Sequence, residues 1–469
     1  MASLLGYFMT MLYNPNNVAI EASPLSTVAE IEVGEQLCEL FGYNIDPDNN
    51  DMPTGWGHIT CDGTVANLES IWIARNLKFY PLSLRLAFRQ GEALEFLSDR
   101  FYVENCQGDW RLFTNLSTWE LLNLRPSDIL DLPDRLRQEH GISNDFLSAV
   151  MNKFTIQSTG KDVLEREFGV KPCQYMLANT RHYSWPKGAA IAGLGSDNVI
   201  GIPVDLGARV DLDELEIMLR ESLKNEQPVL AVVGIMGSTE EGAVDPLGGI
   251  LALRKQLQAE GLSFLVHADA AWGGYFCSML PKDYLPGDIS NLPTEKGATQ
   301  GFVPDASLRA QTQDDLFAMR YADSITVDPH KAGYIPYPAG GLCYRDGRMR
   351  FLVTWTSPYL SRGSVTSIGI YGVEGSKPGA SAMSAWLANK TIGLTQEGYG
   401  SLLGEVTWTC TRLSAEWAAL TDEKSPFICV PFNMLPSELG PNPTTAKIEA
   451  EKKRIRREII SSGLTISRR

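Results

Sequence analysis

The chain has 469 residues, of which 44% are hydrophobic and 21% are charged, a balance typical of a folded globular protein. Its formal net charge of -15 argues against nucleic acid or an anionic membrane surface as the main partner, because such partners bind positively charged surfaces. No apolar run approaches the roughly 18 residues of a membrane span. A small molecule is therefore the favoured partner, with no nucleic-acid or membrane contact.

The cysteines and the amino-terminal residues predict a cytoplasmic protein. Eight cysteines are spaced too widely for a CxxC pair or a zinc site, and they are typical of reduced, mostly buried thiols. The apolar start MASLLGYFMTML lacks the positive residues of a signal peptide, because the first cation in the chain is Arg75.

Two helices are predicted in the first part of the chain. The first covers residues 23–41 and is entered through a Ser-Pro pair. Its apolar stripe is formed by Val28, Ile31 and Leu37. The second covers residues 64–79, by the spacing of its apolar side chains, and is entered through a glycine.

The pattern changes after these helices. Residues 80–165 are polar and aperiodic, and they are interpreted as an insertion with short helices. A capping-box pattern of Asp211 and Glu214 begins a helix predicted over 211–224. The runs predicted as strands are 174–178, 199–204, 229–235, 263–267 and 324–327. Strands that alternate with helices indicate an α/β protein whose mainly parallel sheet is covered on both faces and binds ligands at the carboxyl ends of its strands.

The segment SITVDPHK ends the last of these strands in residues that a protein core rejects. Asp328, His330 and Lys331 follow a β-branched run directly. One explanation is a strand that ends at the surface with a solvated lysine, since strand ends often carry proline and charge. The other is a ligand site, because these residues follow a strand at its carboxyl end.

Other loops carry unusual residues in comparable places, namely TCDGTVAN, TRHYSW, GSTEEGAVD and HADAAWGG. Asp269 follows the apolar run FLVHA, and a buried carboxylate at this position requires a cation or several hydrogen bonds. Taken alone, Asp269 is equally compatible with a helix cap. Together with Lys331 on another strand end, it indicates a site.

These residues match the requirements of pyridoxal 5'-phosphate. The cofactor needs a lysine for its aldehyde, a carboxylate for its pyridine nitrogen, a flat partner over its ring and a helix N-terminus for its phosphate. Lys331 supplies the amine and Asp269 the carboxylate. His182 is predicted to stack on one face of the ring, and Ala271 leaves room on the other. The predicted phosphate-binding residues are Gly63, Thr64 and His330.

The segments HADAAWGG, DSITVDPHK, GSTEEGAVDP and GHITCDGTVANLESIWIAR together resemble the group II pyridoxal-phosphate-dependent amino acid decarboxylases. YNPNNV, PHKAGYIPYPAGG and EGSKPGA are most similar to the bacterial and fungal tyrosine decarboxylase branch. The resemblance implies the aspartate-aminotransferase-like (type I) fold with a mainly parallel seven-stranded sheet, in a homodimer with shared active sites. The implied domains are an amino-terminal arm over 1–45, a large cofactor-binding domain over 46–395 and a small α/β domain over 396–469.

The resemblance also implies roles for single residues. Lys331 matches the Schiff-base lysine, Asp269 the partner of the pyridinium nitrogen and His182 the stacking residue. Thr239 matches a contact near the ring oxygen. Tyr359 matches a loop tyrosine that protonates the substrate carbon, although an ordinary packing role for it stays open. The positions that match phosphate-binding residues are Gly63, Thr64, Ser324, His330 and, toward the partner subunit, Ser376.

The implied activity is decarboxylation of an aromatic, tyrosine-like L-amino acid to its amine and carbon dioxide. Glutamate would need a cation at its distal carboxylate, for which the motif loops offer only Arg181 and Arg362. An aminotransferase is disfavoured, because DPHK together with HADAAWGG is the decarboxylase pattern.

A second hypothesis is a shortened, cofactor-binding but catalytically weak dimer partner, because the family has further segments before the first residue and after PFICVPFNMLP. The phosphate loop reads CDGT where the family commonly has SGGT, so that Asp62 brings a negative charge near the phosphate. The basic run 452–457 is predicted as the solvated face of a helix in the small domain rather than an arm for nucleic acid.

Overall fold

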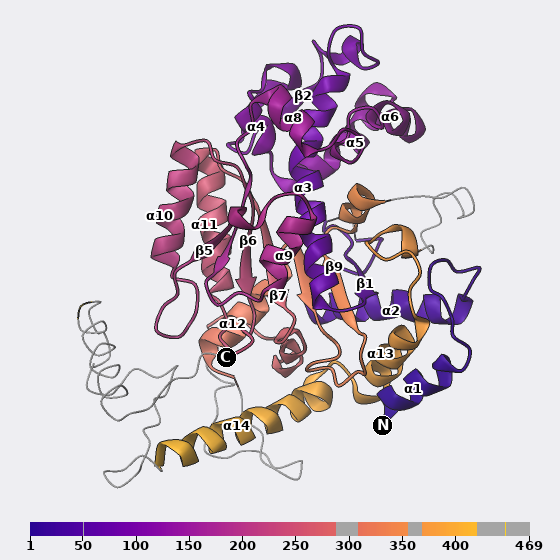
Figure 1. Ribbon diagram of the computed structural model, residues 1–469, viewed down its shortest axis with the longest axis vertical. Helices are drawn as coiled ribbons and strands as arrows, with labels where there is room; N and C mark the ends of the chain where they lie inside the picture. Colours follow the sequence, from indigo (N-terminus) through magenta and orange to yellow (C-terminus); the bar gives the residue numbers. More distant parts are fainter. Residues whose placement is uncertain (50, 288–307, 355–367, 420–445, 447–469) are drawn as a thin grey trace.

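The computed structural model describes residues 1–49, 51–287, 308–354, 368–419 and 446. A seven-stranded sheet in the order β1-β9-β8-β7-β6-β4-β5 lies at its centre (Figure 1). The five strands from β8 to β5 are parallel, and β9 runs antiparallel to both of its neighbours. The strands are β1 (Trp56–Thr60), β4 (Gln174–Ala178), β5 (Val199–Ile202), β6 (Val229–Ile235), β7 (Leu265–Ala270), β8 (Ser324–Val327) and β9 (Gly340–Tyr344).

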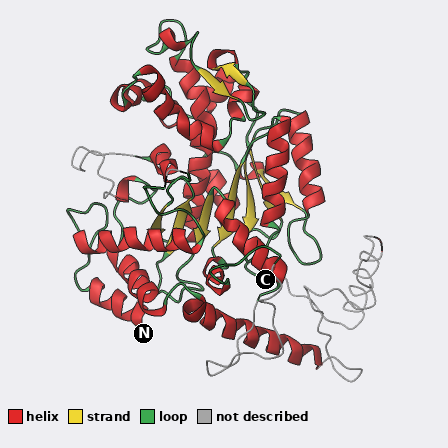
Figure 2. Cartoon of the chain, turned by 180° about the vertical axis from the view of Figure 1, so that it is seen from behind, coloured by secondary structure: helices red, strands yellow, loops and turns green. Residues whose placement is uncertain are grey.

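Helices cover both faces of this sheet (Figure 2). One face packs its apolar side chains against α3 (Gly63–Ala87) and α9 (Ser184–Ile191). The other face is covered by α2 (Pro24–Leu40), α10 (Leu212–Lys224), α11 (Leu247–Glu260) and α12 (Ala310–Ala318). The expected mainly parallel, seven-stranded α/β sheet with helices on both faces is confirmed.

The predicted strands are all present, and three of them, β4, β6 and β8, have the predicted bounds. The exception that matters is β7, which was predicted to end at His267 and continues to Ala270. Asp269 therefore lies inside a buried strand, in register with Ile235 of β6 and Thr326 of β8. The sequence analysis did not identify β1 and β9. In β9 the two leading glycines of GGLCY obscure the strand pattern.

The two predicted helices differ from expectation in detail. Val28 on α2 is 43% exposed, because it lies away from the face on which Leu37 and Val33 are buried. Helix α3 continues beyond the predicted end at Phe79, passes through Pro81 and ends at Ala87. Burial of the side chains after Pro81 outweighs the hydrogen bond that a proline cannot donate. Helix α10 begins where predicted, with the Asp211 side chain accepting two main-chain N–H groups.

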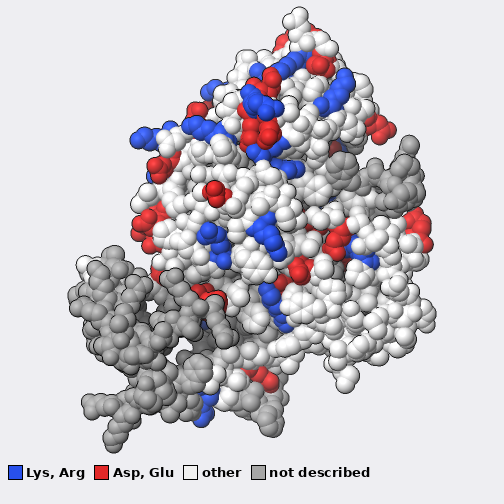
Figure 3. Space-filling model, viewed as in Figure 1, with Lys and Arg blue, Asp and Glu red and all other residues white. Residues whose placement is uncertain are grey.

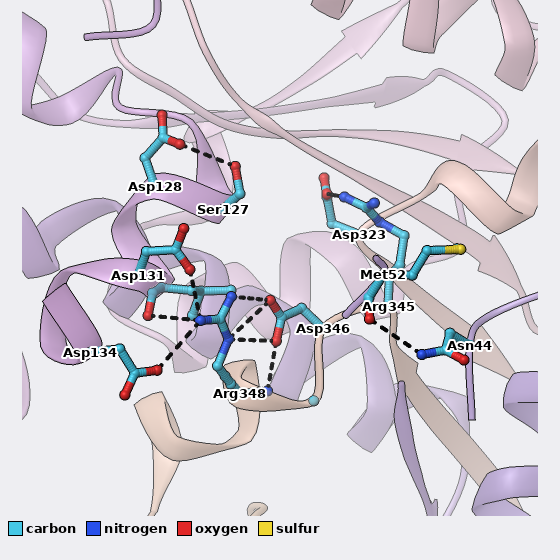
Figure 4. Close-up of polar contacts among 12 residues, drawn as sticks. Asn44, Met52, Ser127, Asp128, Asp131, Asp134, Asp323, Arg345, Asp346 and Arg348 are labelled. Atoms are coloured by element: carbon cyan, nitrogen blue, oxygen red, sulfur yellow. Dashed lines mark hydrogen bonds and ion pairs between the residues drawn. The ribbon is translucent and has the colours of Figure 1, made fainter. Parts of the chain in front are cut away.

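The predicted insertion forms one end of the molecule (Figure 1). Arg348 on the 3-10 helix Gly347–Val353 joins it to the segment after β9, with a nitrogen 2.7 Å from Asp131 Oδ1 and another 2.7 Å from Asp346 Oδ2 (Figure 4). The elements of this region are β2 (Tyr102–Glu104), β3 (Trp110–Leu112), α4 (Thr118–Leu122), α5 (Pro126–His140), α6 (Asn144–Met151), α7 (Ile156–Thr159) and α8 (Lys161–Phe168).

The remaining α-helices with described bounds are α1 (Ala2–Met11), α13 (Gly379–Ile392) and α14 (Ser401–Ala419). Helix α1 packs closely on α13, where a Cβ on Gly6 would lie 2.8 Å from the Met383 carbonyl oxygen. Among the described residues, no helix combines the length and apolarity needed to cross a membrane. The seven described cysteines are free, and five of them are buried. Most of the predicted small domain and the basic run 452–457 lie outside the described residues.

Candidate active site

A cavity of about 160 Å³ lies where the carboxyl ends of β4, β6, β7 and β8 meet the beginning of α3. This is the edge of the sheet at which the sequence predicted a ligand site. The cavity brings together residues from segments that are distant in the sequence. The predicted site residues that line it are Gly63, Thr64, His182, Thr239, Asp269, Ala271, His330 and Lys331.

Asp269 is 5% exposed and is held by three donors. Trp185 Nε1 donates to its Oδ2 at 2.7 Å, and Asn67 Nδ2 donates to the same oxygen at 3.3 Å. The Ala271 N–H lies 3.3 Å from the other carboxylate oxygen. Hydrogen bonds of this kind satisfy the oxygens of a carboxylate in a buried place. The helix-cap alternative for Asp269 is thereby excluded, since the residue lies in β7.

Lys331 forms an ion pair with a carboxylate to which the sequence analysis gave no role. Its Nζ lies 2.9 Å from Oδ2 of Asp328, which is 3% exposed, and Oδ1 of Asp328 has no hydrogen-bond partner among the described residues. Burial raises the pKa of Asp328, although Lys331 and His330 act in the opposite direction. The alternative of a fully solvated lysine is also excluded, because Lys331 lines the cavity.

The two histidines of the site are fixed by their neighbours. His330 Nδ1 donates to the Ala339 carbonyl at 2.6 Å, and its ring packs on Tyr337 with ring centroids 3.9 Å apart. His182 Nδ1 accepts the Ser184 N–H at 3.3 Å and lies 2.9 Å from the Ser184 hydroxyl. Burial lowers the pKa of His182, which favours the neutral, flat ring that can stack on an aromatic ligand.

The beginning of α3 is capped by the protein itself. Asp62 Oδ1 accepts the N–H of Thr64 at 2.8 Å and that of Val65 at 3.4 Å. Gly63 lies against Asp328, and a Cβ at this glycine would be 2.7 Å from each carboxylate oxygen. The sequence predicts that the Thr64 N–H binds phosphate, but in the structure this N–H already donates to the Asp62 carboxylate.

Two of the predicted site residues, Ser324 and Ser376, do not line this cavity. Ser324 begins β8, and its hydroxyl lies 2.8 Å from His267 Nδ1. Since a strand rises about 3.3 Å per residue, Ser324 is roughly 13 Å before Asp328, and its assignment to phosphate is corrected. Ser376 is exposed and accepts a hydrogen bond from Asn16, so its role toward a partner subunit stays a prediction. Tyr359 lies outside the described residues, as does Arg362.

Comparison with known proteins identifies the family. No family model matches the sequence. The chain is 36% identical, over 411 residues, to the L-tyrosine decarboxylases of Enterococcus faecalis and Levilactobacillus brevis, and both matches cover 86% of this chain. The chain belongs to the group II amino acid decarboxylase family. It spans 59% and 58% of the length of these two relatives.

More distant proteins agree with membership of the group II family. The aspartate 1-decarboxylase of Aliivibrio fischeri is 27% identical over 417 residues, which cover 86% of this chain and 56% of that protein. The crystal structure of mouse CSAD matches with a TM-score of 0.56 at 19% identity, covering 90% of this chain and 62% of that one. Oryza sativa TDC with PLP and tryptamine matches with a TM-score of 0.55 at 15% identity, covering 98% and 73%. The expected type I fold is thereby confirmed.

Proposed function

We propose that this chain serves the pyridoxal-phosphate-dependent decarboxylation of an aromatic L-amino acid, with tyrosine as the first candidate. The observation that carries the proposal is the meeting of Lys331, Asp269 and His182 in one cavity. An amine, a buried carboxylate and a flat neutral ring are what this cofactor requires around its aldehyde and its pyridine. The tyrosine decarboxylase relatives support the same reaction.

The residues of the cavity fit the ring end of the cofactor. The Lys331 amine is available for the aldehyde, and the small Ala271 side chain lies with His182 around the same space. When bound, pyridoxal phosphate would supply an electron sink for the decarboxylation of the amino acid. Asp269 supplies the negative charge that keeps a bound pyridine nitrogen protonated, and Trp185 and Asn67 hold that carboxylate in place.

Charge and shape at the cavity support an aromatic substrate over an acidic one. The lining includes three carboxylates, Asp62, Asp269 and Asp328, and among the described lining residues no arginine. A second carboxylate on the substrate would meet like charges there, and like charges at short distance are unfavourable. Aromatic side chains also line the cavity, namely Tyr183, Trp272 and Tyr337.

A panel of amino acids tests this proposal. With pyridoxal phosphate present, tyrosine, DOPA, tryptophan or phenylalanine is expected to yield amine and carbon dioxide, while aspartate and glutamate are turned over at least about 100-fold less efficiently in kcat/KM. A preference for either acidic substrate would overturn the substrate class. Keto acid formation would indicate an aminotransferase instead. Cofactor binding without amine from any substrate would favour the catalytically weak dimer partner.

We further propose that two copies of the chain form a homodimer through α1. This helix carries no charged residue, and Figure 3 shows a surface with few charges over α1 and α13. Apolar patches of this kind mark protein interfaces. The exposed apolar residues of α1 and its end are Leu4, Leu5, Phe8, Met9, Met11 and Leu12. We also propose a cytoplasmic location and the domain bounds 1–45, 46–395 and 396–469.

Light scattering coupled to gel filtration tests the dimer. The wild-type chain is expected to elute with twice its monomer mass, and the double variant Phe8→Asp/Leu12→Asp with the monomer mass, because two charges would be buried without partners. Phe146→Asp places one charge at an exposed phenylalanine of the insertion and should leave the dimer intact. A wild-type monomer, or an unchanged dimer in the double variant, contradicts the assignment to α1.

A further inference from the structure

The amino end of α3 is occupied by a carboxylate of the protein. A long helix exposes unpaired N–H groups and a partial positive charge at this end, which makes it suitable for phosphate. Here the Asp62 Oδ1 accepts the Thr64 N–H at 2.8 Å and lies 3.4 Å from the Val65 nitrogen. The main chain of Asp62 is held in place as well, because the Thr60 hydroxyl donates to the Asp62 carbonyl oxygen at 3.0 Å.

A second carboxylate faces the same place. Asp328 is 3% exposed, lines the cavity beside α3 and lies against the Cα of Gly63. Its Oδ2 is paired with Lys331, whereas its Oδ1 has no partner among the described residues. A third acidic side chain, Glu374, accepts the N–H of Cys61 at 2.8 Å. A phosphate dianion that approaches the α3 amides therefore meets negative charge. Lys331 is the lysine that lines the same cavity, and it is paired with Asp328.

We propose that the Asp62 side chain competes with the phosphate of the cofactor for the N-terminal amides of α3, and thereby sets how tightly this chain retains its cofactor. The inference rests on the proposed function. Binding of the phosphate to these amides requires that the Asp62 carboxylate release the Thr64 N–H. The ring end of the site, with Asp269 and His182, is untouched by this exchange.

The proposed competition predicts different effects on the binding of two ligands. Pyridoxal phosphate needs the α3 amides, whereas pyridoxal, which has the same ring and aldehyde without the phosphate, does not. Removing the Asp62 carboxylate should therefore improve binding of the first ligand and leave the second nearly unchanged. Serine is the suitable replacement, because it caps helices about as well as aspartate and keeps α3 folded, while its neutral hydroxyl can release the Thr64 N–H and donate a hydrogen bond to the phosphate.

Equilibrium dialysis of the apoprotein tests this proposal without reference to activity. Asp62→Ser is expected to lower the Kd for pyridoxal phosphate at least about tenfold, and to change the Kd for pyridoxal by less than about threefold. Asp62→Asn, which also removes the charge but keeps a side chain of the size of aspartate over the α3 amides, should lower the Kd for pyridoxal phosphate by a smaller factor than Asp62→Ser. Asp211→Ser is the matched control, since Asp211 caps α10 in the same way and does not line the cavity.

An unchanged or raised Kd for pyridoxal phosphate in Asp62→Ser would overturn the competition. An equal gain for both ligands would also overturn it, because the effect would then lie at the ring end. If folded wild-type and Asp62→Ser chains bind neither ligand, the proposed function itself fails and the inference fails with it. Circular dichroism of each variant establishes that it is folded.

Discussion

Lys331→Ala is expected to lower kcat at least about 10³-fold and to abolish the visible absorption band of the bound cofactor. Lys331 is the lysine of the described cavity, and it reaches that place because β8 ends in the DPHK turn beside α3. No other described lysine lines the cavity, so none can replace its amine. Absorbance and amine release are measured on the same sample after dialysis with excess cofactor.

Lys187→Ala is the control for this change. Lys187 lies near the site, with its Nζ 4.9 Å from the centre of the Tyr183 ring, but it does not line the cavity. Its loss should leave both the band and turnover close to wild type. A visible band that persists in Lys331→Ala while turnover continues would mean that another amine holds the cofactor, and the assignment of the site would be wrong.

Asp269→Asn is expected to retain part of the cofactor while lowering kcat about 10² to 10³-fold. A neutral amide no longer stabilises positive charge on a bound pyridine nitrogen. If the new NH₂ group takes the place of Oδ2, it faces two donors, Trp185 Nε1 and Asn67 Nδ2, neither of which can accept a hydrogen bond from it. Steady-state kinetics and the amount of bound cofactor, determined together, separate the loss of chemistry from the loss of binding.

Trp185→Phe gives the comparison for Asp269→Asn. It keeps the carboxylate and a large buried ring but removes the hydrogen bond of 2.7 Å. A loss of about tenfold is expected, as for one hydrogen bond to a charged group. Turnover near wild type in Asp269→Asn would remove this carboxylate from the mechanism. Equal losses in the two variants would show that the hydrogen-bonded position of the carboxylate is more important than its charge.

The sequence predicted the sheet and the ring end of the site because both depend on local patterns. Continuous apolar runs such as 229–235 mark buried parallel strands, and the carboxyl ends of two such strands carry Asp269, within β7, and Lys331, in the turn after β8. The strand β7 was predicted too short, because Asp269 interrupts its apolar pattern while three donors from elsewhere make the carboxylate acceptable inside it.

The remaining site features depend on contacts between distant segments. The approach of Asp328 to Gly63 joins β8 to α3, and no spacing within either segment reveals it. Ser324 lies in the same motif as Lys331. Only the direction of β8 shows that Ser324 lies at the end of the strand opposite the site. The Asp62 cap was foreseeable as a charge near the helix, but the occupied Thr64 amide required atomic positions.

The tight backbone contacts beside Asp62 restrict how this site can evolve. A side chain at Gly63 would collide with the Asp328 carboxylate, and one at Gly340 of β9 would collide with the main chain of Asp62. A larger residue at either glycine would force apart the segments that hold α3, β8 and β9 together. At residue 62, by contrast, a substitution can change the charge at the phosphate end of the site without a collision between these segments.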